Sequence, residues 1–275
     1  MPQSQPINSS QTDGLSSQFQ RRWESTYHWR SMCSMLLGTP GLRAAWPMSS
    51  VNYALAECID ISGQANHLQT AAALGNVTYG RDPLGIAPIA LFAGGANQYI
   101  YKLDGGVANW ADIAIAGGDV QIIATQRGLT LGGWFYWAAL PGAAQGLIFK
   151  DDGGANRQYQ LVLNAANTIG FTVWAGPVAV ASATTINAGW NHCVGVYDQA
   201  SQDLSVVLNG VVTTNAGAAP AVLADTGAPF TVGADGGGGS LFTGYGSDCF
   251  LCAASLSLGF VKAGFHYTKA AFGVK

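Results

Sequence analysis

The feature that most limits the fold of this chain is a series of short apolar runs over residues 129–234, each followed by a turn signal. The runs are rich in Val, Leu, Phe, Tyr, Trp and Thr, which favour strands, and no helical pattern lies between them. Asp152-Gly153, Gln202-Asp203 and Asn209-Gly210 each predict a hairpin, and the last predicts a tight one. Regular hairpins without intervening helices are typical of two antiparallel sheets packed face to face.

Composition supports an all-β chain. The 275 residues include 37 glycines, and only Glu24 and Glu57 among the 15 acidic residues are glutamates. Helix-rich proteins instead place many Glu and Lys residues on their exposed faces. Only 10% of the residues are charged, against about 25% in an ordinary soluble domain. We therefore expect polar uncharged side chains, or partners, to cover much of the surface.

Charge and hydropathy exclude several classes of protein. A net charge of −3 provides no basic field that could hold nucleic acid. No run of about 18 apolar residues is present, so no membrane span or membrane partner is expected. The first 22 residues lack the apolar segment of a Sec signal, which predicts synthesis in a reducing cytoplasm without Sec export. The five cysteines are accordingly predicted to be buried, reduced thiols.

The N-terminal region differs from the rest of the chain. Residues 1–14 are polar and predict an extended arm, and residues from about Ser16 to Leu37 predict a helix that ends at Gly38 and Pro40. Aromatic side chains lie on two sides of this helix, so we expect one side to face the body of the protein and the other a second chain. The candidate assembly-interface residues are Phe19, Trp23, Tyr27 and Trp29.

The C-terminal residues return to helical spacing. Phe260, Gly264 and Phe265, followed by Thr268 and Phe272, predict a short C-terminal helix. The predicted domains are residues 1–40, an arm and helix that anchor the protein in an assembly, and residues 41–275, the β-sandwich.

Several pieces of sequence in a fixed order carry a family resemblance. They are Ala45–Met48 (AWPM), Cys58–Leu68 (CIDISGQANHL), Trp190-Asn191-His192, Tyr197-Asp198 and Leu208-Asn209-Gly210. Together with the strands between them they resemble the laminin G-like, concanavalin A-like jelly roll over about residues 42–272. The resemblance implies that the N-terminal pieces pair with the C-terminal ones in one domain. The arm and helix before the jelly roll are similar in organisation to laminin G-like virion proteins of tailed bacteriophages.

No catalytic arrangement is present in the sequence. Glycoside hydrolysis uses two carboxylates, usually including Glu, and the glucanases of this fold carry them as E-x-D-x-E on one strand, a motif that this chain lacks. Asp151 and Asp152 are adjacent, so we assign them to a hairpin turn. No G-x-S-x-G is found, and the histidines are scattered. The protein is therefore predicted not to be an enzyme.

For two histidines and one cysteine pair, we predict structural and not catalytic roles. We expect His192 to hydrogen-bond a backbone carbonyl or a loop, and His67 to stabilise the D-x-S-G turn. Cys249 and Cys252 are three residues apart on a predicted strand and therefore point to opposite faces, which disfavours a zinc site. Trp134, Trp190 and Val196 are predicted to be buried in the sandwich.

The sequence contains no recognisable motif for binding calcium or a sugar, but it offers candidate residues for both. The resemblance implies one candidate cofactor, calcium, because related laminin G-like domains often hold it at a rim of the sandwich. Asp60, Asp225 and Asp235 are its candidates by loop position, although solvated turn aspartates explain them as well. A sugar-binding platform needs exposed aromatic side chains, for which Trp110, Trp137 and Trp174 are candidates, with burial in the core or an interface as the alternative.

These observations predict a non-enzymatic virion structural protein, either a capsid decoration protein or a tail-associated one. Its expected partners are the major capsid protein or other virion proteins and further copies of itself, and its expected location is the virion. The alternative function is that of a carbohydrate-binding module that attaches to a glycan surface.

Overall fold

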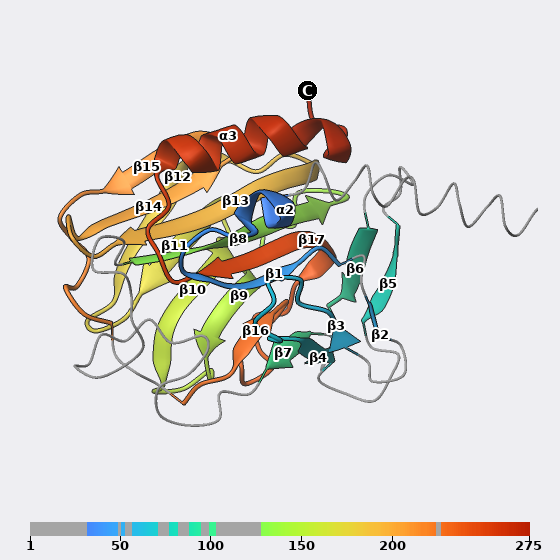
Figure 1. The fold of residues 1–275 in the computed structure, drawn as a ribbon, viewed down its shortest axis with the longest axis horizontal. Helices are drawn as coiled ribbons and strands as arrows, with labels where there is room; N and C mark the ends of the chain where they lie inside the picture. The colour runs from blue at the N-terminus through green and yellow to red at the C-terminus, as the bar shows by residue number, and fades with distance from the viewer. Residues whose placement is uncertain are drawn as a thin grey trace, which may run out of the picture.

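The computed structural model describes residues 32–48, 51–52, 57–70, 77–81, 88–94, 99–102, 128–223 and 227–275. Within them, two antiparallel sheets pack face to face as a jelly-roll sandwich, and short helices lie against one of the sheets (Figure 1). The all-β fold class is therefore confirmed. None of the described helices is long and apolar enough to cross a membrane.

The first sheet contains the longest strands. In spatial order they are β15 (Val211–Asn215), β14 (Asp203–Leu208), β13 (Gly189–Asp198), β8 (Gly128–Trp137), β17 (Thr243–Cys252), β6 (Pro88–Ala93) and β5 (Thr78–Arg81), and β1 (Leu42–Trp46) also pairs with β17. The pairing of β1 with β17 confirms that the N-terminal pieces pair with the C-terminal ones.

The second sheet faces the first across the core. Its strands, in spatial order, are β12 (Val178–Thr185), β11 (Thr168–Val173), β10 (Arg157–Leu163), β9 (Gln145–Asp151), β16 (Phe230–Val232), β7 (Ile100–Lys102), β4 (Leu68–Thr70), β3 (Glu57–Cys58) and β2 (Val51–Asn52). Strands distant in sequence are neighbours in this order, as in β9–β16–β7, so this sheet joins segments from residues 51–232.

The predicted hairpins are present. Asn209 and Gly210 join β14 to β15 with φ angles of 51° and 80°, the left-handed pair that a tight hairpin requires. Gln202 lies in the turn between β13 and β14 with a φ of 57°. Asp152 and Gly153 lie in the turn between β9 and β10.

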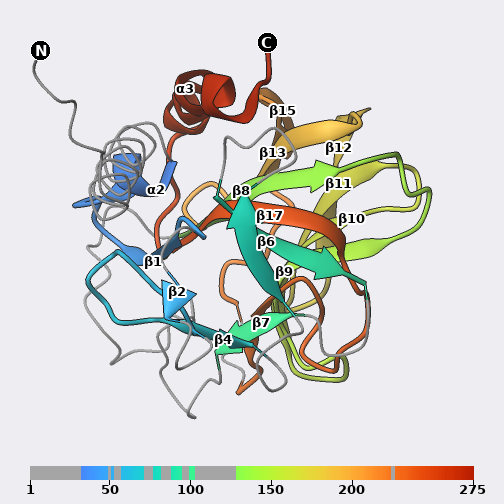
Figure 2. The ribbon, with the colours of Figure 1, turned by 90° about the vertical axis from the view of Figure 1, so that its right-hand side faces the viewer.

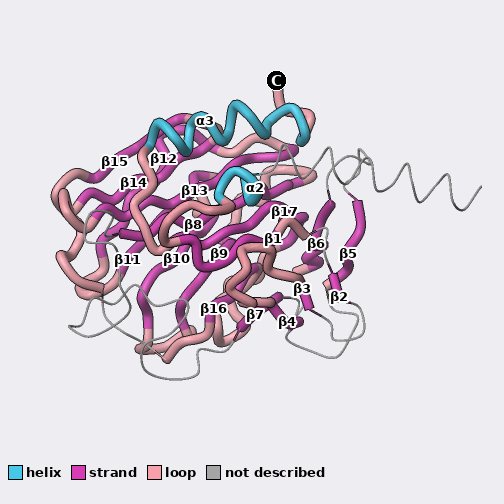
Figure 3. The backbone as a smooth tube through the Cα atoms, in the orientation of Figure 1, coloured by secondary structure: helices cyan, strands magenta, loops and turns pink. Residues whose placement is uncertain are grey.

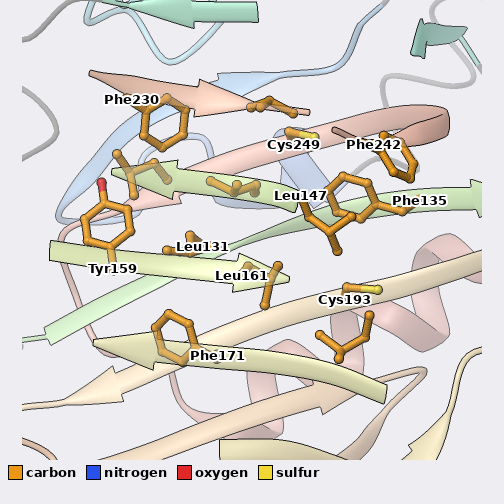
Figure 4. Packing of buried hydrophobic residues seen from close by; sticks show 14 of the residues in the cluster. Leu131, Phe135, Leu147, Tyr159, Leu161, Phe171, Cys193, Phe230, Phe242 and Cys249 are labelled. Carbon is orange, nitrogen blue, oxygen red and sulfur yellow. The ribbon is translucent and has the colours of Figure 1, made fainter. Parts of the chain in front are cut away.

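Alternate side chains of both sheets form the core between them. Leu131 and Phe135 of β8 meet Leu161 and Phe171 of the second sheet in this layer (Figure 4). The opening strand contributes Trp46, whose ring stacks on Phe230 with a centroid separation of 5.2 Å. Because the period of a strand is two, the even-numbered residues of β8 and β13 point away from this core.

Three helical segments cover that outer face of the first sheet: α2 (Met32–Leu36), α3 (Leu258–Thr268) and the 3-10 turn η1 (Lys269–Phe272) (Figures 2 and 3). The predicted C-terminal helix is confirmed, and it starts where the Ser257 side chain accepts a hydrogen bond from the Phe260 N–H. The expected helix from Ser16 is described only from Met32 onward. Its candidate interface residues Phe19, Trp23, Tyr27 and Trp29 lie outside the described residues.

The position of three buried residues corrects one expectation. Trp134, Trp190 and Val196 are buried, with exposed fractions of 0%, 4% and 3%. They do not lie between the sheets, however, because their even register places them on the outer face, beneath the helices. A sequence pattern gives the alternation of a strand but not which of its two faces meets the other sheet.

A buried carboxylate joins α2 to the sandwich. Asp248 occupies a β-bulge of β17 with a φ of 51°, and its two oxygens accept the backbone N–H groups of Met32 and Cys33 at 2.5 and 3.0 Å. Met32, Cys33 and Leu36 are fully buried. The last turn of the predicted 1–40 segment is thus part of the packing of the jelly roll.

Candidate functional site

Three aromatic side chains lie in a row at one end of the first sheet. Tyr136, near the end of β8, is paired directly with Trp190 of β13 on one side and with Tyr245 of β17 on the other. Directly paired residues point to the same face of a sheet. The ring centroid of Tyr136 is 5.5 Å from that of Trp190 and 5.2 Å from that of Tyr245. The two tyrosines are half-buried, and we call the three residues the aromatic row.

A first groove, of about 400 Å³, opens beside Tyr136 and Tyr245. Its other walls come from β6 and from the loop that follows β8, including Leu91 and Pro141. Gln145 lies in its lining and is largely buried. The Trp137 indole N–H donates to the Oε1 of Gln145 at 2.9 Å. An indole can only donate, so this bond fixes the orientation of the Gln145 amide and leaves its NH₂ group for another acceptor.

A second groove, of about 540 Å³, lies on the other side of Tyr136. It is bounded by Trp190, by the loop before β13 with Asn187, and by the end of α3 with His266 and Lys269. Tyr136 contributes to both grooves, so the aromatic row forms the ridge between them.

Hydrogen-bonded amides hold the loop that walls the second groove. The Asn191 Oδ1 accepts the backbone N–H of Asn187 at 3.0 Å and the Asn209 Nδ2 at 2.9 Å. The Asn191 Nδ2 donates to the Asn187 carbonyl at 2.7 Å. The backbone of Asn187 is thus held in place, while its side chain is exposed to the groove. The Trp190-Asn191-His192 piece of the sequence therefore builds this wall.

Other aromatic rings pack against Trp190 of the aromatic row and hold it in place. The ring of Phe272 lies 4.9 Å from Trp190 and stacks on Trp134 at 4.3 Å, with an angle of 14° between the planes. Trp134 also contacts Phe265 of α3 at 5.9 Å. These contacts tie the position of Trp190 to the C-terminal helical segment.

His192 differs from its predicted role. Its backbone N–H donates to the Asn209 Oδ1 at 2.8 Å, but its ring is fully buried and neither ring nitrogen has a hydrogen-bond partner in the described part of the chain. The expectation that the ring satisfies a carbonyl is wrong, because the ring lies against Trp134 at 5.1 Å and Phe265 at 6.0 Å. Burial lowers the pKa of His192 to about 3.

The D-x-S-G turn is confirmed as a structural element. The Asp60 Oδ1 accepts the N–H groups of Ala45 and Ser62, each at 2.8 Å, and its Oδ2 accepts the Ser62 hydroxyl at 2.7 Å and the Asn66 N–H at 2.9 Å. His67 accepts the Asp60 N–H at its Nδ1 at 3.0 Å. Protein donors therefore fill both oxygens of this calcium candidate.

Of the other two calcium candidates, only Asp235 lies within the described residues. The Asp235 Oδ1 accepts the N–H groups of Gly237 and Gly239 at 3.0 and 2.7 Å, and Asp225 lies outside the described residues. No group of three or more His, Cys, Asp or Glu side chains suited to a metal ion forms within the described ranges. Cys249 and Cys252 face opposite sides of β17, as the strand period predicted.

Asp151 and Asp152 build the β9–β10 turn. Asp151 pairs with Arg157 at 3.3 Å and accepts the Gly153 N–H, whereas Asp152 accepts the N–H groups of Gly154 and Asn156. Burial raises the pKa of Asp151, although Gly153 and Arg157 oppose the shift, and the hydrogen bond from Gly154 is the main cause of a lowered pKa of Asp152. Neither carboxylate lines either groove.

Of the three tryptophans predicted as candidates for a sugar-binding platform, two lie within the described residues. Trp137 is 1% exposed and belongs to the sandwich core, so its prediction as an exposed platform is wrong. Trp174 is half-buried beneath the Arg157 guanidinium, 5.6 Å from its ring, and Trp110 lies outside the described residues. Sequence reasoning missed Tyr136 and Tyr245. The even register that Tyr136 shares with Trp134 was the available signal.

Comparisons with solved structures show the same fold. The binding domain of Paraclostridial mosquitocidal protein 1 is 13% identical, with a TM-score of 0.58, over 82% of this chain and 52% of that one. The binding domain of botulinum neurotoxin DC in complex with SialylT is 10% identical, with a TM-score of 0.55, over 83% and 52%. This chain thus spans about half the length of both. Domain 4 of AbnA, a GH43 extracellular arabinanase from Geobacillus stearothermophilus, in complex with arabinotriose, is 15% identical, with a TM-score of 0.56, over 81% and 97%.

Sequence comparison gives a family assignment. No curated protein matches the sequence. The model of the concanavalin A-like lectin/glucanases superfamily matches residues 104–250, more than half of the chain. The sandwich, its strand order and the solved structures above agree with that match. The chain therefore belongs to the concanavalin A-like lectin/glucanases superfamily, in its laminin G-like branch.

Proposed function

We propose that the protein is a non-enzymatic carbohydrate-binding module whose ligand lies along the aromatic row. The observation that carries the proposal is the pair of half-buried tyrosines, Tyr136 and Tyr245, beside a groove with an oriented Gln145 amide. This reverses the order of the two functions expected from the sequence.

The chemistry of a sugar fits this arrangement. One face of a pyranose or furanose ring consists mainly of C–H groups, which pack against an aromatic ring, while its hydroxyl groups need directional partners. Tyr136 and Tyr245 offer the aromatic surface. Gln145, whose Oε1 is held by the Trp137 indole, offers a polar amide in the lining of the first groove.

The ligands in similar solved structures support a saccharide as the ligand of this protein. Two of the solved structures named above were determined with SialylT and with arabinotriose. The arabinanase domain is matched over 97% of its length, so the likeness covers essentially that whole domain.

The described lining of the two grooves lacks the residues of glycoside hydrolysis. Glycoside hydrolysis needs two carboxyl groups about 5–10 Å apart around the scissile bond. Among the described residues that line the two grooves, none is Asp or Glu. We therefore propose binding without turnover.

The experiment is a saccharide-binding screen with the full-length protein, followed by calorimetric titration of the strongest ligand. Tyr136→Ala and Tyr245→Ala should each weaken binding about tenfold, the loss expected for one aromatic contact. Trp174→Ala is the matched control, because Trp174 is a half-buried aromatic residue in the turn after β11, outside both grooves. Failure of the wild-type protein to bind any saccharide, or weakening by Trp174→Ala alone, would contradict the proposal.

The virion role stays a prediction from the organisation of the first 40 residues. It includes the expected capsid partners, self-association and location in the virion. Attachment to a particle through the N-terminal segment does not conflict with a sugar site on the first sheet.

A further inference from the structure

We infer that the second groove binds an anionic saccharide unit, carboxylated or sulfated, while neutral units of the same glycan lie over the first groove. This inference rests on the proposed function and adds the class of ligand. It depends on an unequal distribution of charge between the two grooves.

The C-terminal segment is basic, whereas the chain as a whole is acidic. Residues 249–275 contain Lys262, Lys269, Lys275 and His266 but no Asp or Glu, whereas the whole chain has a net charge of −3. Lys262, His266 and Lys269 follow one another at intervals of four and three residues, so they share one face of α3 and its continuation.

Three of these residues, His266, Lys269 and Lys275, line the second groove. No Asp or Glu side chain is among the lining residues of this groove. The Lys269 amine lies 5.9 Å from the ring of Phe265, and it forms no ion pair with any described residue. A half-buried ammonium without a carboxylate partner, beside an apolar ring, is less screened than a fully exposed one. It therefore favours an anion in the adjacent space.

Neutral donors lie next to these cations. The exposed Asn187 side chain lines the same groove, on a backbone held by Asn191. A carboxylate or sulfate has several acceptor oxygens and can take one bond from an amide and another from an ammonium. The first groove, by contrast, has no charged residue in its described lining. Since Tyr136 borders both grooves, one oligosaccharide can occupy them together.

The test uses matched oligosaccharides with the full-length protein at low ionic strength. The probes are an oligosaccharide that ends in a uronic acid, the same compound with its carboxyl group reduced to the alcohol, and a sulfated neutral analogue. We expect the carboxylated or the sulfated probe to bind about tenfold more tightly than the reduced one, as for one charge-assisted hydrogen bond. Comparison of the two anionic probes identifies which anion the groove prefers.

Lysine variants test whether the preference for the anionic probes arises in the second groove. Lys269→Gln combined with Lys275→Gln should bring the anionic and reduced probes to within about twofold, and Lys269→Arg alone should retain the preference. Lys262→Gln is the matched control, because Lys262 lies on the same helix outside the groove lining. The preference should also shrink as salt is raised, because screening weakens the attraction. Shifts of the Asn187 side-chain amide in NMR spectra, on addition of the anionic probe, would place it in the second groove.

Several outcomes would overturn the inference. Equal affinity for the anionic and reduced probes rejects it but leaves the proposed function intact. An equal effect of Lys262→Gln and of the combined Lys269→Gln and Lys275→Gln variant shows a diffuse charge effect and not a groove. Tighter binding to anionic vesicles or to single-stranded nucleic acid than to any saccharide rejects it in favour of a general anionic surface. Absence of binding to all saccharides rejects both the inference and the proposed function.

Discussion

The ring of Phe171 in β11 lies against the backbone of Gly195 in β13, across the interior of the sandwich. A Cβ atom on Gly195 would come within 2.6 Å of that ring. Phe171 is fully buried, so the ring has no solvent space into which it can move. The two sheets approach each other closely here only because one of the facing residues has no side chain.

Gly195→Ala should therefore destabilise the fold by about 1–3 kcal/mol, the range for overpacking of a buried site. Urea denaturation measures the change in the free energy of unfolding. Gly227→Ala is the control, since an added Cβ there meets nothing within 4 Å and the backbone conformation is ordinary. Equal stability of the Gly195 variant and the wild-type protein would show that the sheets are not in contact at this point.

The contact between Asp248 and α2 predicts a second effect. Asp248→Asn keeps the left-handed bulge conformation, which Asn tolerates, but removes the charge that accepts two N–H groups of the helix. The free energy of unfolding should fall by about 1–2 kcal/mol. Amide hydrogen exchange should accelerate in residues 32–36 more than in β13. Uniform acceleration in both segments would contradict the capping role.

His192 predicts a dependence of stability on pH. Its pKa in the folded protein is about 3, whereas an unperturbed histidine titrates near 6.5. Between these values the unfolded chain binds a proton that the native protein does not. The contribution to stability is thus complete above about pH 6.5 and falls by up to about 1.4 kcal/mol per pH unit toward pH 3.

Replacement of that side chain tests the assignment. His192→Leu should flatten the dependence of the unfolding free energy on pH in this interval, with little loss of stability at pH 7, because the ring nitrogens have no partner within the described residues. His266→Leu, at an exposed histidine of α3, is the control. The assignment fails if both variants leave the same slope as the wild-type protein.

The N-terminal anchor is tested by two truncations. Deletion of residues 1–30 should leave a folded sandwich with unchanged saccharide affinity but abolish self-association or attachment to particles. Deletion of residues 1–40 also removes the buried side chains of Met32, Cys33 and Leu36, and it should lower stability by several kcal/mol, about 2–5 for each large buried side chain lost. Attachment that survives the shorter deletion would reject the anchoring role, and mass spectrometry of purified particles measures the occupancy.

Much of the fold was predictable because it depends on short-range patterns. The hairpin at Asn209-Gly210 follows from two residues that accept a positive φ, and the Asp60 turn follows from a side chain that bonds its own neighbours. The opposite facing of Cys249 and Cys252 needs only the strand period. The ends of α3 likewise follow from Ser257 and from the spacing of its apolar residues.

The site was not predictable in the same way. The expected sugar-binding residues were tryptophans, but Trp137 lies in the core, because its odd register points between the sheets. The tyrosines beside it in sequence and across the sheet form the surface instead. Whether Tyr136 or Trp137 faces outward depends on which side of β8 meets the second sheet.

The sequence by itself determined the strands, their hairpins, the all-β class and the superfamily, because these depend on neighbouring residues, periodicity and motif order. Only the tertiary structure decided that β8 lies between β13 and β17, which brings Tyr136, Trp190 and Tyr245 into one row. It also decided that the C-terminal segment packs on this face and brings Lys269 to the second groove. These contacts join residues more than fifty positions apart, and they form because the apolar outer face of the first sheet must be covered.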